Sequence, residues 1–327
     1  MIRAINAVLA ISAGVGGALV LFWLLNAIAD RLPSRWEERL KPYLYLLPAL
    51  AVITLFLLYP AIQTIVYSFA NETSTRWVGL ENYTSLLSRA DFIQVTLINT
   101  LLWIAVVPAV VVALGLMVAV LADRLNPRGE KLSKTIIFLP MAISGVASAA
   151  IWRFVYEVRP AGTPQVGLQN AVWTALGFDP VAWLQLDTAK LNTFMLMIIL
   201  VWAQAGFAMV LLSAAIKGVP DETLEAALVD GANQRQIFFR VIVPQIWGTV
   251  VTVFITVLIG VMKIFDVVYV MTGGNFNTDV IAVRFIRELI ISGDAGRAAA
   301  IVVMLMIAII PIMVYQVHHF RGQEAQR

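Results

Sequence analysis

Four ionisable side chains interrupt stretches of the sequence that are otherwise apolar: Arg153, Glu157, Lys263 and Asp266. A charge near the middle of a membrane-spanning helix costs about 2.5–3.5 kcal/mol, so each of these groups needs a partner or a function. Arg153 and Glu157 are four residues apart, which favours a local ion pair on one helix face. Lys263 and Asp266 are three residues apart and have the spacing for a second pair.

Aromatic residues accompany the second pair. Phe265 and Tyr269 lie on either side of Asp266, and Gln204 and Phe207 form a similar polar and aromatic group in another apolar stretch. Such groups suit sugars, whose apolar ring faces stack on aromatic rings while their hydroxyls form hydrogen bonds with polar side chains. Packing between helices explains the same residues equally well, so the sequence leaves both interpretations open.

The chain carries no motif for common kinds of enzyme chemistry. It has no Gly-x-x-x-x-Gly-Lys-Ser/Thr loop for ATP phosphates, no Gly-x-Ser-x-Gly elbow and no His-Glu-x-x-His sequence. Without cysteine it has neither a thiol nucleophile nor a zinc–thiolate site. Its only histidines, His318 and His319, point about 100° apart on a helix, which favours an interfacial position over a metal site. We therefore expect no catalytic site, no metal and no cofactor in this chain.

The composition is that of a membrane protein. Hydrophobic residues make up 60% of the chain and charged residues 13%, about half the charged share of a soluble domain. The net charge of +3 is small and spread over short loops, so nucleic-acid binding has no support. Prolines inside the apolar runs, such as Pro140, predict kinks. We expect an all-α integral membrane protein with about seven transmembrane helices, at 5–29, 44–70, 97–122, 135–157, 191–216, 247–272 and 298–320.

The basic residues predict the orientation, because cytoplasmic loops carry an excess of Lys and Arg. With the C-terminus inside, the cytoplasmic segments are 30–43, 123–134, 217–246 and 321–327. They carry thirteen Lys and Arg in 63 positions, against eight in the 88 positions of the outer segments. The density differs more than twofold, so we expect a cytoplasmic C-terminus and an N-terminus outside.

The first apolar run has a second interpretation, because Ala27-Ile28-Ala29 resembles a signal-peptide cleavage site. The run from Ala7 to Leu25 is long for a signal peptide, however, and basic residues follow it at 31, 35, 39 and 41. We expect a retained span, followed by a short helix at 34–40 lying at the inner membrane interface.

Loop 217–246 has the pattern of a folded element. Pro220 suits the start of a helix, and Gly231 suits a helix end in the left-handed conformation. A second short helix is expected over 233–241, ending before Pro244.

Residues of the first of these helices suit a contact with another protein. Ala226 and Ala227 are small enough for a partner to approach the backbone closely, and Glu225 and Asp230 carry charges able to fix its register. A solvated helical hairpin without a partner is the alternative.

These residues resemble a known pattern. Glu225-Ala226-Ala227, then Gly231, then Val241-x-Val243-Pro244 is similar to the EAA loop of permease subunits in bacterial ABC importers, with Val at two positions where Ile and Leu are usual. In that family the loop forms a coupling helix that docks in a cleft of the ATP-hydrolysing subunit. The resemblance therefore implies a coupling loop at 217–246 that uses Glu225, Ala226, Ala227, Asp230, Gly231 and Pro244.

Further segments resemble the carbohydrate-uptake branch of this family, the maltose and α-glucoside permease type, over roughly residues 42–320. They include Gly79 to Tyr83, Phe138-Leu139-Pro140 and Phe265 to Gly274. The resemblance implies a permease domain at 44–320, an accessory N-terminal helix and interfacial segment at 1–43, and a cytoplasmic tail at 321–327. It also carries over Gln204, Phe207, Asp266 and Tyr269 as candidates that line the solute path.

The resemblance implies a function and partners as well. The chain would be the permease subunit of an ATP-driven importer of an α-glucoside-like di- or oligosaccharide in the bacterial cytoplasmic (inner) membrane. It would work by alternating access with a second homologous permease subunit, two subunits that bind ATP and Mg, and an extracytoplasmic sugar-binding protein.

Two other functions are alternatives to the importer subunit. An ion-coupled secondary carrier would use Lys263 and Asp266 as its coupling site, although no internal repeat is visible. An intramembrane enzyme has no recognisable nucleophile or metal pair here. The outer loop 158–190 is too apolar for a free linker and suits either a lid over the outer mouth or a contact with a binding protein.

Overall fold

The computed structural model describes residues 2–29 and 34–324, and all secondary structure in this part of the chain is helical apart from an isolated bridge between Ala70 and Trp77. Residues 30–33 and 325–327, with the basic residues counted there, lie outside the described residues, as do the side chains of 34–40 and of His319. Contacts divide the chain into two compact units, Met1–Val66 and Tyr67–Arg327.

The first unit is a pair of apolar helices. Helix α1 (Ile2–Ala29) meets α2 (Ser34–Ile53) where Phe22 stacks on Tyr45 at 6.2 Å and the Tyr45 hydroxyl donates to Asn26 at 2.7 Å. Through a π-helical turn, α2 continues into α3 (Tyr59–Tyr67). Residues 34–40 form the first turns of α2 rather than a separate helix, since α2 continues through Pro42 and Pro48 into the apolar stretch. Their interfacial position stays a prediction.

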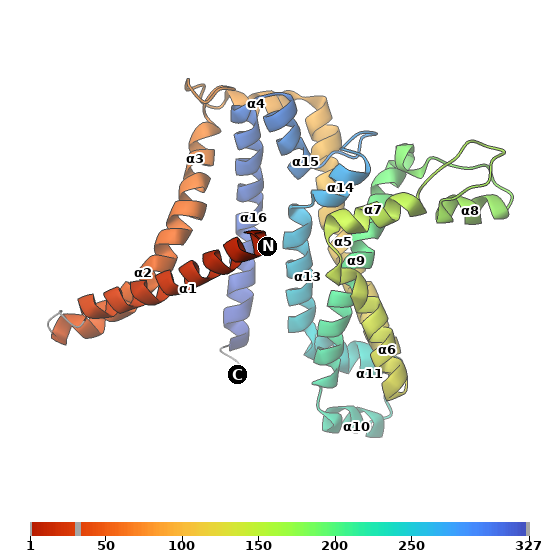
Figure 1. Ribbon diagram of the computed structural model, residues 1–327. Coiled ribbons are helices and arrows are strands. Elements are labelled where there is room, and N and C mark those ends of the chain that lie inside the picture. Colours follow the sequence, from red (N-terminus) through yellow and green to blue (C-terminus); the bar gives the residue numbers. More distant parts are fainter. Residues whose placement is uncertain (1, 30–33, 325–327) are drawn as a thin grey trace. The chain divides into compact units, whose positions relative to one another are not determined.

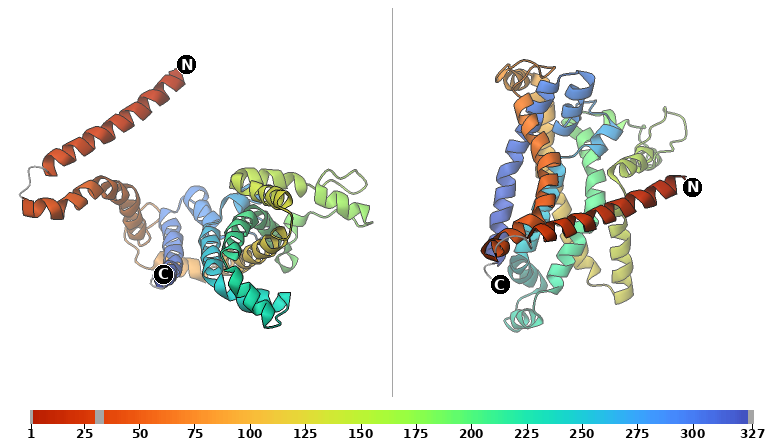
Figure 2. Two further views of the ribbon diagram at one scale, coloured as in Figure 1. Left: turned by 90° about the horizontal axis from the view of Figure 1, so that it is seen from below. Right: turned by 60° about the vertical axis from the view of Figure 1, so that its left-hand side comes forward.

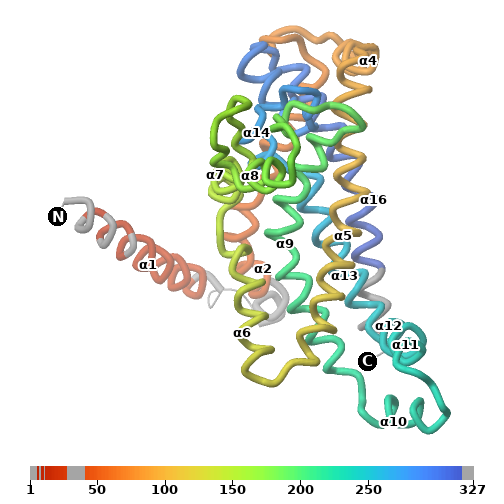
Figure 3. Tube along the Cα trace, turned by 90° about the vertical axis from the view of Figure 1, so that its right-hand side faces the viewer, coloured from red at the N-terminus to blue at the C-terminus, as the bar shows by residue number. Residues whose placement is uncertain are grey.

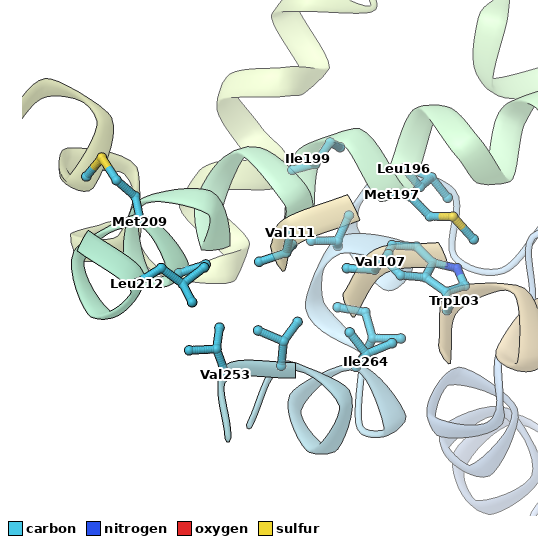
Figure 4. Packing of buried hydrophobic residues seen from close by; sticks show 14 of the residues in the cluster. Trp103, Val107, Val111, Leu196, Met197, Ile199, Met209, Leu212, Val253 and Ile264 are labelled. Carbon is cyan, nitrogen blue, oxygen red and sulfur yellow. The ribbon is translucent and has the colours of Figure 1, made fainter. Parts of the chain in front are cut away.

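Three long helices form the core of the second unit: α5 (Ile98–Ala122), α9 (Leu191–Lys217) and α13 (Trp247–Met262). Helix α5 packs against both others, and the left view of Figure 2 looks along this bundle. Figure 4 shows the apolar core between them, which includes Trp103, Val107, Val111, Leu196, Met197, Ile199, Met209, Leu212 and Val253.

Small residues allow the helices of this core to approach closely. A methyl group on Gly115 of α5 would come within 2.5 Å of the Ala208 Cβ on α9. A methyl group on Gly206 of α9 would come within 2.4 Å of the Ile137 carbonyl oxygen, at the end of α6 (Pro127–Phe138). Glycine therefore sets the spacing of α9 from both neighbours.

Long apolar helices are confirmed, but the count of seven spans is approximate. In the described residues, four helices are long and apolar enough to cross a membrane: Lys41–Tyr67, Phe92–Ala122, Thr188–Lys217 and Ala295–His318. Two bent helix pairs raise the number to six if each is one span, and Ser12–Ala27 is a shorter apolar helix.

The predicted span 135–157, for which a kink is expected at Pro140, consists of two helices in the structure. Helix α6 tightens into a 3₁₀ turn at Leu139–Ala142, Ile143 is extended, and α7 (Gly145–Val155) leaves at 105°. Ser144 caps the new helix by accepting a hydrogen bond from the Ala147 amide at 3.2 Å. Pro140 lies in the turn, so the predicted kink at this proline is a full break.

The predicted span 247–272 is also broken. Helix α13 ends at Met262, and a separate helix α14 (Asp266–Met271) follows after Lys263, Ile264 and Phe265. Phe265 has non-helical backbone angles of φ −133° and ψ −58°. Charged and aromatic residues of this stretch therefore lie at a helix break and not inside one helix.

The segments that connect the helices of the second unit lie at two opposite ends of it. In Figures 1 and 3, α10 (Asp221–Val229) lies at the end opposite α4 (Glu81–Ser88), and in Figure 1 α15 (Ile281–Ile286) lies near α4. Helix α6 begins, and α16 (Ala295–Glu324) ends, toward the α10 end. The segments 123–134 and 217–246 therefore share one side, as the charge pattern predicts.

Candidate coupling and solute-path sites

The loop 217–246 folds as its sequence predicts over its first half. Helix α10 ends at Val229, and Gly231 takes the left-handed conformation with φ +80°. The Gly231 amide donates to the Leu228 carbonyl at 3.0 Å, which closes the helix end. Asn233 then caps α11 (Gln234–Ile237) through a reciprocal pair of hydrogen bonds with Gln236.

The second half of the loop differs from the prediction at Pro244. The helical path does not stop before this proline but runs from Gln234 to Gln245, with a π-helical segment at 238–242. Pro244 lies near the end of this path, in the three-residue element α12 (Val243–Gln245), which follows the π-helical segment directly. The chain bends at Ile246 instead, and α13 leaves at 68°.

The predicted coupling residues lie on an open surface. Glu225, Ala226, Asp230, Gly231 and Pro244 are exposed, and Ala227 is half-buried. Apolar neighbours are exposed with them: Val229 is 88% exposed, Phe239 67% and Leu228 52%. Exposed apolar side chains beside acidic groups are typical of a surface that another protein covers.

The break before α14 exposes the predicted solute-path residues Asp266 and Tyr269. Tyr269 stacks on Phe265 with ring centres 4.8 Å apart, so an aromatic pair stands beside the carboxylate. The carboxylate also lies against the start of α7, since a methyl group on Gly145 would come within 2.7 Å of Asp266 Oδ2.

The expected ion pair between Lys263 and Asp266 is absent. No salt bridge within 4.0 Å joins them in the described residues, and both are exposed. The spacing of three residues brings the two side chains together only on a continuous helix, and the break at 263–265 interrupts that helix. Both charged groups are thus open to a solute or a partner.

A polar stripe on α13 was missed by the sequence reasoning. Thr256, Gly260 and Lys263 are exposed along one helix face, with Thr252 half-buried one turn before. Each threonine hydroxyl donates to the carbonyl four residues earlier at 2.8 Å. The spacing of three and four residues was visible in the sequence, but the apolar average of the run hid it. The stripe leads to Asp266.

The other two predicted path residues lie on α9. Gln204 and Phe207 are half-buried, and Phe207 packs against the apolar core that includes Val267 and Val268 of α14. In the described residues no hydrogen bond or ring contact joins Gln204 or Phe207 to Asp266 or Tyr269. The structure places α9 beside α14 without bringing the four side chains together.

The predicted pair of Arg153 and Glu157 is wrong. Helix α7 ends at Val155, so the two side chains do not share a helix face. Glu157 pairs with Arg159 at 3.6 Å instead. Arg153 and Glu157 both line a cavity of about 470 Å³ at the C-terminal ends of α7 and α14, together with Phe154, Tyr156, Val158, Ala182, Trp183, Leu184, Gln185 and Met271.

The outer loop 158–190 is a folded element, as its apolar content predicts. Buried Asn170 of α8 (Leu168–Ala175) accepts hydrogen bonds from the Val181 amide at 3.0 Å and the Trp183 indole at 3.1 Å. Trp173 stacks on Phe178 with ring centres 4.3 Å apart. The choice between a lid and a protein contact stays open.

A network of ion pairs at the α4 end was not predicted from the sequence. Buried Arg284 pairs with Asp91 at 2.9 Å and with Glu288 at 3.1 Å, and Arg89 also contacts Glu288 at 3.1 Å. Burial raises the pKa of the nearby Asp279 carboxyl, although Arg287 and Arg284 oppose the shift. Arg284 and Glu288 are both buried, so removing either one would leave the charge of the other with less compensation inside the fold.

Comparison with known proteins adds to this geometry. Residues 111–323 match the family described as binding-protein-dependent transport system inner membrane component. The alpha-glucoside transport system permease protein AglF of Rhizobium meliloti is 43% identical over an aligned length of 333 residues, and the alignment covers 98% of each chain. The osmoprotective compounds uptake permease protein GgtC of Synechocystis is 44% identical over 87% of this chain and 100% of its own.

A solved structure has the same fold. It is a bacterial ABC transporter involved in the import of the acidic polysaccharide alginate, with a TM-score of 0.75 and 22% identity over 88% of this chain and 99% of that one. The likeness supports the helical permease fold.

Proposed function

Because the chain belongs to the family of binding-protein-dependent transport system inner membrane components, we propose that it is the permease subunit that passes an α-glucoside-like sugar through an ATP-driven importer of the cytoplasmic membrane. One observation carries the proposed substrate class: the identity of 43% with an α-glucoside permease extends over 98% of both chains. The chain itself is a transport subunit, and ATP and Mg belong to partner subunits.

The proposed solute path runs along α13 and α14. The stripe of Thr256, Gly260 and Lys263 leads to Asp266 and the stacked ring of Tyr269. Lys263 is exposed at a break between two apolar helices, and a charge at such a place is costly against lipid, which supports a water-filled path on this face. Threonine hydroxyls, a carboxylate and an aromatic ring together match the hydroxyls and apolar faces of a sugar. Gln204 and Phe207 would contribute from α9.

The proposed coupling surface lies at the α10 end. Glu225, Ala226 and Asp230 would meet a cytoplasmic ATPase subunit, with Gly231 shaping the loop. This assignment puts the C-terminus of the chain in the cytoplasm and the α4 end toward an extracytoplasmic binding protein. We also propose that 44–320 is the transport domain and 1–43 an accessory segment.

Reconstitution tests this function. The chain, its partner permease, the two ATPase subunits and the binding protein are placed in liposomes, and uptake of radiolabelled trehalose or maltose is followed. We expect uptake that needs both ATP-Mg and the binding protein. Accumulation by the isolated chain with an ion gradient and no ATP would support the ion-coupled carrier and contradict the proposal.

A further inference from the structure

Five polar side chains join three helices at the end of the second unit where α10 lies. Asp123 ends α5, Glu130 and Lys134 belong to α6, and Ser213 and Lys217 belong to the last turns of α9. We call these five residues the inner ion cluster. Two lysines and two carboxylates make it neutral.

Lys134 is the centre of the cluster. Its ammonium group lies 2.6 Å from Asp123 Oδ1 and 2.6 Å from Glu130 Oε1, and it also donates to the Ser213 hydroxyl. One side chain thus contacts all three helices. Its side chain is only 19% exposed, and those of Asp123 and Glu130 are 17% and 20% exposed.

The remaining contacts close the network. The Ser213 hydroxyl donates to Asp123 Oδ1 at 2.9 Å, and Lys217 pairs with Glu130. Partly desolvated ion pairs are stronger than exposed ones, and a network in which every member has a partner is rigid. The cluster therefore fastens the last turn of α9 to α5 and α6.

The position of the cluster relates it to α10. Helix α9 ends at Lys217, and only Gly218, Val219 and Pro220 separate it from α10. The segment after α10 has no comparable ion pairs. Arg235 and Arg240 form no ion pair in the described residues, and the chain bends by 68° at Ile246. The two segments that flank α10 thus differ: the end of α9 is held by ion pairs, and the helical path 234–245 is joined to α13 through a bend.

We propose that Lys134 is a positioning residue for energy coupling: it makes α5, α6 and the end of α9 move as one body when α10 is displaced. A displacement of α10 would then move the whole of α9, and with it Gln204 and Phe207, instead of only bending the end of α9. The inference rests on the proposed function, in which an ATPase subunit moves α10.

The test uses the complete reconstituted transporter and measures sugar uptake and ATP hydrolysis in the same vesicles. For Lys134→Met we expect sugar molecules moved per ATP to fall about tenfold, a typical size for a coupling change, while hydrolysis continues. Lys131→Met is the matched control, because Lys131 lies on the same helix, is exposed and forms no ion pair in the described residues. Lys134→Arg keeps the charge and should recover most of the ratio.

A distance measurement separates coupling from mere stability. The chain contains no cysteine, so spin labels go on Arg128→Cys in α6 and Gly218→Cys at the end of α9 without background. We expect a narrow distance distribution in the ATP-free and vanadate-trapped states, and a broad trapped-state distribution with Lys134→Met. An unchanged sugar-to-ATP ratio with Lys134→Met, or an equal loss with Lys131→Met, would overturn the inference. Failure of the proposed function would instead appear as absent ATP-dependent uptake in the unmodified transporter.

Discussion

Replacing Gly231 by proline is expected to abolish ATP-driven uptake while the chain still inserts in the membrane. Gly231 has φ +80°, and its amide donates to the Leu228 carbonyl at 3.0 Å. Proline holds φ near −65° and has no amide hydrogen, so the corner between α10 and α11 has to rearrange. The exposed face of Glu225, Ala226 and Asp230 would then no longer fit the ATPase. Uptake and co-purification of the ATPase subunit measure the effect.

Gly218→Ala is the matched control for this change. Gly218 lies in the same loop, has an ordinary φ of −85°, and has room for a methyl group, whose nearest neighbour would be the Ala215 carbonyl oxygen at 3.4 Å. Uptake should stay close to that of the unmodified transporter. Normal uptake with Gly231→Pro, or an equal loss with Gly218→Ala, would contradict a coupling role for this corner.

Replacing Asp266 by asparagine is expected to raise the KM for sugar about tenfold, because a hydrogen bond to a charged group contributes about 1.5–3 kcal/mol. The carboxylate is exposed and has no ion-pair partner in the described residues, and asparagine keeps the shape that packs against the start of α7, so the change breaks no ion pair of the fold. Assembly with the ATPase subunits and basal ATP hydrolysis should remain. Uptake over a range of sugar concentrations gives the KM.

Asp179→Asn serves as the control for Asp266→Asn. Asp179 is an exposed carboxylate of the outer loop without an ion pair in the described residues, and its loss should not change the KM. An unchanged KM with Asp266→Asn would remove Asp266 from the solute path. Tyr269→Ala then tests whether the aromatic ring acts without the carboxylate.

Sequence predicted the helical membrane fold well and its breaks poorly. Apolar runs of about 20 residues identify membrane helices because burial of side chains in lipid depends on composition more than on order. The direction of a helix depends on single backbone angles. Neither the extended Ile143 nor the φ of −133° at Phe265 leaves a trace in average hydropathy.

Local signals were predicted where both partners are close in the chain. The helix end at Gly231 and the start of a second helix near Asn233 were predicted because turn and cap preferences act over three or four residues. Long-range pairs were not. Arg89 and Glu288 are 199 residues apart, and Lys134 and Ser213 are 79 apart, so only the folded chain reveals that they meet. In the sequence, Arg89 and Lys134 contribute only to the predicted orientation.

A cross-link from α10 tests directly whether this helix contacts the ATPase subunit. A single photoreactive residue in place of Ala226, which is exposed on the proposed coupling surface, is introduced into the assembled transporter. The same residue in place of Asp179 in the outer loop is the control. We expect position 226 to capture the ATPase subunit and position 179 not to do so. Capture of the ATPase from position 179, or none from position 226, would contradict this expectation.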